Sequence, residues 1–135
     1  MKVFTFRYQK GIRKKVLSEM KEVMRTGRPK VHNNEMLCDS VESLLQCISK
    51  SRMEAFLAII EHKPESVYEL AQALGKDQAN VLKDAKALEG MGLIELKPVK
   101  DGNRERLKPK PLFDAVVVEM GQQSVEEAPP RKKAV

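Results

Sequence analysis

Apolar side chains recur with helical spacing over the centre of the chain. One stripe falls at i, i+3, i+4 and i+7, on one face of a helix: Val67, Leu70, Ala71 and Leu74. Ser66 and Glu69 form a capping box at its start, and Gly75 suits its end. After a short turn, Asp77 is a suitable N-cap for a second helix, whose inward stripe is Val81, Ala85 and Leu88. The pattern predicts two helices at helix-turn-helix spacing.

A β-hairpin is predicted directly after the second helix, which Gly90 and Gly92 are expected to end. Residues 93–99 favour a strand, and a returning strand begins at Leu107. The connection, residues 100–104, contains Asp101-Gly102, a pair typical of tight hairpin turns.

Two further helices are predicted upstream of this unit. Ser51 and Glu54 form a capping box before the stripe of Met53, Phe56, Leu57 and Ile60, and Pro64 is expected to stop that helix near residues 61–63. Asp39 and Glu42 form a similar box before the stripe of Val41, Leu44, Leu45 and Ile48. Residues 36–38 are a candidate short strand.

The N-terminal third has a different pattern. Phe4, Phe6 and Tyr8 alternate with polar residues, which predicts a strand with one aromatic face. Residues 11–26 predict an amphipathic helix with the apolar stripe Ile12, Val16, Leu17, Met20, Val23 and Met24, and a basic face of Arg13, Lys14, Lys21 and Arg25. Such a helix serves oligomerisation, binds a partner, nucleic acid or a membrane surface, or packs on its own domain. Membrane binding is the weakest of these alternatives, because Glu19 and Glu22 interrupt the basic face and the sequence has no lipidation motif. We favour oligomerisation or partner binding.

These patterns together predict an α+β, mainly helical protein in three segments. Residues 1–34 form a strand and basic helix that extend the core, with residues 28–34 as a linker. Residues 35–120 form the winged helix-turn-helix core, and residues 121–135 form a disordered tail rich in charge and proline.

The stretch from about residue 41 to residue 120 resembles the MarR-like winged-helix DNA-binding proteins, and specifically their small antitoxin-type members of the TumA kind. The resemblance rests on segments in this order: residues 51–54, Pro64-Glu65-Ser66-Val67, Glu69-Leu70-Ala71, residues 74–77, Asn80-Val81, Lys83-Asp84, residues 87–89, residues 92–95 and Phe113-Asp114. It implies a sequence-specific DNA binder that regulates its own operon and neutralises a toxin encoded beside it. Leu82 and Ala85 depart from the pattern, because a polar, DNA-facing residue and a larger apolar residue are usual there.

The net charge of +6 is unevenly distributed along the 135 residues. Residues 1–34 carry ten Lys and Arg against two acids, whereas residues 51–96 carry five against eight. Residues 97–110 carry six against two. Because phosphate contacts supply most non-specific affinity for DNA, the hairpin is a better phosphate binder than the helices. Its basic residues are Lys97, Lys100, Arg104, Arg106, Lys108 and Lys110.

No arrangement of residues indicates an enzyme. His32 and His62 have no partners at metal-ligand spacing, and Cys38 and Cys47 also lack such spacing. Both cysteines are expected to pack as small apolar residues without a disulfide. We therefore expect no catalytic residues, no metal and no cofactor. The sequence also has no signal peptide and no apolar run of membrane-spanning length, so we expect a cytoplasmic protein that does not bind membranes.

The sequence therefore predicts a dimeric, DNA-binding transcriptional repressor of the antitoxin kind. Gln78, Asn80 and Lys83 are the candidates for contact with base edges in double-stranded DNA. The candidates for phosphate contact are Lys86, Lys100, Arg104 and Arg106. The alternative is a protein-interaction module that uses the winged helix only as a scaffold, which the acidic helices and Leu82 favour.

Overall fold

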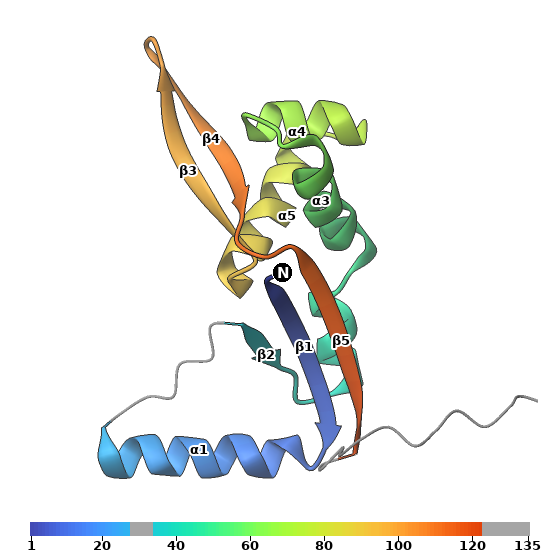
Figure 1. Ribbon diagram of the computed structural model, residues 1–135, viewed down its shortest axis with the longest axis vertical. Coiled ribbons are helices and arrows are strands. Elements are labelled where there is room, and N and C mark those ends of the chain that lie inside the picture. Colours follow the sequence, from blue (N-terminus) through green and yellow to red (C-terminus); the bar gives the residue numbers. More distant parts are fainter. Residues whose placement is uncertain (28–33, 123–135) are drawn as a thin grey trace, which may run out of the picture.

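The computed structural model describes residues 1–27 and 34–122, which form an α+β fold (Figure 1). Three helices lie together: α3 (Lys50–His62), α4 (Val67–Leu74) and α5 (Gln78–Met91). The antiparallel hairpin of β3 (Ile94–Asp101) and β4 (Arg104–Pro111) follows α5 and projects beside the helices (Figure 1). The predicted succession of two capped helices and a hairpin is confirmed.

Local capping determines where α4 and α5 begin. The Ser66 hydroxyl accepts a hydrogen bond from the Glu69 backbone N–H at 3.1 Å, and the Asp77 carboxylate accepts one from the Asn80 N–H at 3.3 Å. Both caps satisfy amides that have no partner within the helix. Helix α5 continues through Gly90 and ends at Gly92, whose φ of 88° favours glycine. Gly90 therefore does not end the helix, contrary to the sequence prediction.

Two predicted caps are wrong by one or two residues. Helix α3 is capped by Ser49, which accepts a hydrogen bond from the Arg52 N–H, whereas the Ser51 hydroxyl donates to Asp84 at 3.3 Å. Helix α2 (Val41–Cys47) is capped by Ser40 rather than Asp39. Both segments contain neighbouring residues that are suitable caps, and the sequence pattern alone does not distinguish them.

The hydrophobic core follows the predicted stripes of α2 to α5 with three exceptions, one of which is Val41 of α2, 41% exposed. Val81, Ala85 and Leu88 of α5 are buried, as are Val67, Leu70 and Ala71 of α4. Leu57 of α3 and Leu45 of α2 are exposed by 62% and 58%, so their predicted inward positions are wrong. Helix α3 instead turns Ala55, Phe56 and Ile59 inward, because this face meets α4 and α5.

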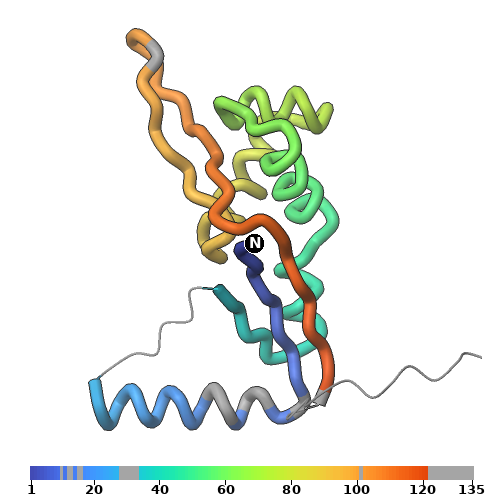
Figure 2. Tube along the Cα trace, in the orientation of Figure 1, coloured from blue at the N-terminus to red at the C-terminus, as the bar shows by residue number. Residues whose placement is uncertain are grey.

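A second sheet joins the two ends of the described chain. Its strands are β2 (Glu35–Leu37), β1 (Val3–Lys10) and β5 (Ala115–Gln122), in that order and all parallel (Figure 2). The backbone N–H of Lys2 donates to the Asp114 carboxylate at 2.8 Å, and the Asp114 N–H donates to the Lys2 carbonyl at 2.8 Å. The aromatic face is buried, with Phe4 and Phe6 only 1% and 0% exposed. Residues 1–34, expected as an extension, thus supply the central strand of a sheet that shares the main core.

Strand β5 also changes the expected tail. Gly121 and Gln122 belong to the strand, so they are not part of a disordered tail. Residues 123–135, and residues 28–33 of the expected linker, lie outside the described residues.

Helix α1 (Ile12–Thr26) leaves the end of β1 and runs across the strand direction, at the opposite end of the molecule from the hairpin tip (Figure 1). It ends at Gly27, as the sequence predicts. Leu17, Met20 and Met24 of its apolar stripe are exposed by 51%, 57% and 86%. These side chains are therefore not packed on the protein's own core. Within residues 1–27 and 34–122, no helix has both the length and the apolar character needed to cross a membrane.

Candidate nucleic-acid interface

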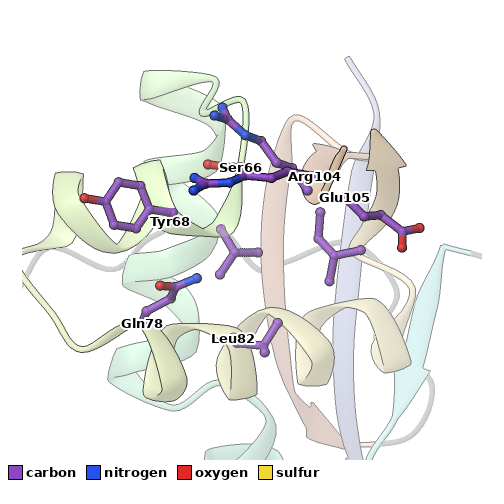
Figure 3. A pocket seen from close by; sticks show the side chains of 9 residues that line it. Ser66, Tyr68, Gln78, Leu82, Arg104 and Glu105 are labelled. Atoms are coloured by element: carbon purple, nitrogen blue, oxygen red, sulfur yellow. The ribbon is translucent and has the colours of Figure 1, made fainter. Parts of the chain in front are cut away.

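A groove of about 700 Å³ lies between the hairpin and the first turns of α4 and α5 (Figure 3). Val67, Leu82 and Leu107 supply its apolar lining. Its polar lining consists of Ser66, Tyr68, Gln78, Arg104, Glu105 and Arg106. In the close view, arginine side chains of β4 extend toward α4, whereas Glu105 points away from the centre of the groove (Figure 3). Two guanidinium groups therefore stand at the rim of a partly apolar groove.

Ionic contacts position the hairpin against α4. The Lys108 ammonium of β4 lies 3.2 Å from the Glu65 carboxylate, just before α4. The Glu65 backbone N–H in turn donates to the Glu69 carboxylate at 2.8 Å. On the other side, the Leu96 N–H of β3 donates to the Glu89 carboxylate of α5 at 2.7 Å. The hairpin is thus connected to both helices that form the groove.

Helix α3 supports the opposite side of the helix-turn-helix unit. The Lys76 ammonium, in the turn between α4 and α5, donates to the Glu54 carboxylate of α3 at 3.1 Å. This hydrogen bond, with the positive charge of Lys76, lowers the pKa of the Glu54 carboxyl. The Ser51–Asp84 hydrogen bond described above joins α3 to the middle of α5. These contacts fix the orientation of α5 relative to the rest of the core.

The structure brings only some of the predicted site residues together. Gln78, Arg104 and Arg106 line the groove itself. Asn80, Lys83 and Lys86 are exposed on α5, and Lys100 is exposed on β3, opposite Glu105 of β4. By helical spacing, Ala79, Lys83, Lys86 and Gly90 share the outward face of α5, opposite Val81, Ala85 and Leu88. This face carries positive charge but few hydrogen-bonding groups.

Several groove residues were not predicted as site residues. Tyr68 is 55% exposed, and its hydroxyl accepts a hydrogen bond from the Gln72 side-chain amide at 2.9 Å. An aromatic residue just after a predicted helix N-cap is a signal that sequence reasoning could have used. Ser66 was predicted only as a cap, and Leu82 only as a departure from the family pattern. Leu82 is half-buried and packs against the core beside the groove, which explains why an apolar side chain suits that position.

The match to a known family covers the whole groove. A family model described as HVO_A0114 matches residues 47–118, from the last residue of α2 to the middle of β5. Helix α1 and strands β1 and β2 lie outside the matched residues. No curated protein matches the sequence.

Proposed function

The chain belongs to the HVO_A0114 family, and we propose that it is a sequence-specific DNA-binding transcriptional regulator with a winged helix-turn-helix core. One observation carries the proposal: Arg104 and Arg106 line a groove opposite the first turns of α4 and α5. One ion pair and one hydrogen bond connect the hairpin to the helical side of this groove. Guanidinium groups bind phosphate oxygens in bidentate fashion, and a helix N-terminus also favours an anion. The groove therefore suits a DNA backbone.

In the proposed complex, the outward face of α5 enters the major groove of duplex DNA and β4 follows the adjacent backbone. Lys83 on this outward face contacts base edges, together with Gln78 and Asn80, which flank it in the first turn of α5. Amides pair with adenine, and lysine reaches the acceptors of guanine. Lys86, Lys100, Arg104 and Arg106 contact phosphates. Glu54 of α3 and Glu65, just before α4, form ion pairs with Lys76 and Lys108, which reduces the negative charge near this surface.

The resemblance to antitoxin-type regulators also suggests a biological role. We propose that the protein represses its own operon and neutralises a toxin encoded beside it. A small adjacent reading frame supports this role, whereas a free-standing gene contradicts it. Neutralisation is tested by co-expressing the neighbouring gene with this protein.

We also propose that the protein acts as a homodimer through α1, so that two heads reach successive major grooves. Replacing Met20 by Glu places a charge on the exposed apolar stripe and is expected to shift the protein toward monomers in sedimentation velocity. Leu57→Glu is the matched control, because Leu57 on α3 is exposed to a similar extent, 62% against 57% for Met20. A mass that is the same for the wild type and the Met20→Glu variant contradicts the role of α1.

The direct test of DNA binding is a titration of the DNA upstream of the gene at several salt concentrations. We expect saturable binding whose affinity falls steeply with salt, by about one logarithmic unit of slope for each phosphate contact. A random duplex of equal length is the control and should bind more weakly. Absence of salt-sensitive, saturable binding would overturn the proposal.

The second candidate function is a protein-interaction module, which the apolar lining of the groove favours. Val67, Leu82 and Leu107 offer contacts that a DNA phosphate does not use. Replacing Lys83 and Arg104 separates the two functions: a DNA-binding protein loses DNA affinity while it keeps its fold, whereas an interaction module keeps its partner.

A further inference from the structure

Three sulfur atoms lie together where β2 meets α2, on the far side of the molecule from the groove. The Cys47 thiol donates a hydrogen bond to the Met36 thioether, with 3.7 Å between the sulfur atoms. The Cys38 thiol lies near that of Cys47, and burial and this neighbour raise its pKa. Nothing in the proposed DNA binding uses these residues.

The fold explains why the side chains of Met36, Cys38 and Cys47 lie close together. Met36 and Cys38 are two positions apart along an extended segment, so their side chains point to the same face of the sheet. Met36 pairs with Phe6 of β1, and this face packs against α2. Leu44 of α2 is fully buried against it, and Cys47 lies three residues further, on the same side of the helix.

The three sulfur side chains lie in or at the edge of the hydrophobic core, where water is largely excluded. Cys38 is 2% exposed, whereas Cys47 and Met36 are half-buried at the edge of the core. Two of the three sulfur side chains therefore lie at the edge of the core, and the third lies beneath them.

We propose that Met36, Cys38 and Cys47 bind a soft monovalent cation, Cu(I), in a three-sulfur site. Thiolate and thioether ligands are soft and favour soft metals such as Cu(I). A soft ion bonded to sulfur at about 2.3 Å, as zinc is to thiolates, spaces its ligands in a trigonal plane about 4 Å apart. The 3.7 Å between Cys47 Sγ and Met36 Sδ is close to that spacing. Zinc does not suit the site, because it takes four ligands, and no group of three or more His, Cys, Asp or Glu able to hold a metal occurs within residues 1–27 and 34–122.

Binding releases the thiol protons of Cys38 and Cys47 to solvent and forms two metal–thiolate bonds and one metal–thioether bond. No electron is transferred, because the metal enters and stays as Cu(I). The bound ion connects β2 to the C-terminal end of α2, and this connection exists only in the folded protein. Cu(I) is therefore expected to stabilise the native state.

The test is a Cu(I) titration of the reduced, full-length protein without oxygen, in competition with the chromophoric chelator bicinchoninate. We expect one Cu(I) per chain and a rise in melting temperature on loading. Cys47→Ser is expected to weaken binding by more than about 100-fold, and Met36→Leu by about tenfold, because the thioether is the weaker ligand. Met53→Leu is the matched control, since Met53 packs half-buried against the same core from α3, and should bind as the wild type does.

Circular dichroism of each variant shows whether the fold is retained. Because Cys47 is only half-buried, its serine variant keeps the test interpretable if Cys38→Ser unfolds. Failure of the wild type to compete with bicinchoninate would overturn the proposal, as would unchanged binding by the folded Cys47→Ser variant. Neither result bears on DNA binding, which has its own salt titration.

Discussion

Replacing Arg104 and Arg106 together by alanine is expected to weaken binding to the upstream DNA by about 100-fold at moderate salt. Each arginine stands at the rim of the groove, and a hydrogen bond to a charged group contributes about 1.5–3 kcal/mol, or roughly tenfold or more in affinity. The dependence of log affinity on log salt should also become shallower by about two, one for each lost phosphate contact. A filter-binding or anisotropy titration at four or more salt concentrations measures both quantities.

Arg25→Ala is the matched control for this experiment. It removes the same positive charge from α1, at the end of the molecule away from the hairpin tip (Figure 1), where Arg25 pairs with Glu22 at 2.7 Å. If charge alone governed binding, the control would lose about half as much as the double variant. If the groove binds the backbone, the control should change affinity by less than about twofold. Equal losses for each charge removed would therefore contradict a role for the groove.

The elements with strong local signals were predictable from the sequence. The ends of α4 and the start of α5 are determined by the caps Ser66, Gly75 and Asp77. Each cap depends only on its own backbone or on that of residues a few positions away, so it can be recognised without the tertiary fold. The hairpin was predictable for the same reason, because its turn lies at Gly102, with φ of 66°. The α5 stripe was predictable because Val81, Ala85 and Leu88 have one consistent inward side.

Contacts between distant segments were not predictable from these patterns. Phe6 of β1 pairs with Val118 of β5 across 112 positions, and alternation in either segment does not identify the partner strand. Each of α2 and α3 has apolar residues on more than one side, which is why Leu45 and Leu57 were assigned inward. The apolar lining of the candidate groove likewise depends on how the hairpin meets α4 and α5, not on any single segment.

The proximity of the cysteines illustrates the same limit. Cys38 and Cys47 have no recognised metal spacing in sequence, and Met36 is not part of any usual motif. The turn from β2 into α2, capped at Ser40, brings the three sulfur atoms together. A chemical cluster can therefore form where spacing rules predict none.

The second large effect concerns stability. Replacing Phe6 by alanine is expected to lower the free energy of unfolding by about 3–5 kcal/mol, because its ring is fully buried and the cavity does not collapse completely. Phe6 also contacts Phe4 edge-on, with ring centroids 5.1 Å apart, and Phe4 contacts Phe113 in the same way at 5.2 Å. These contacts connect β1 to the segment that leads into β5. The loss is a large fraction of the roughly 5–15 kcal/mol that stabilises a domain.

Urea unfolding followed by far-ultraviolet circular dichroism measures this effect, because the signal comes mainly from the helices. If β1 belongs to the same cooperative unit as α3, α4 and α5, Phe6→Ala lowers the midpoint of the helical transition. If residues 1–34 unfold independently, the signal of α1 is lost in a separate transition, and the midpoint for α3, α4 and α5 stays where it is in the wild type. Leu57→Ala is the control and should cost less than about 0.5 kcal/mol, since Leu57 is exposed on α3. A shared transition means that β1 and the groove are stabilised together, although Phe6 and Arg104 lie 98 positions apart in the sequence.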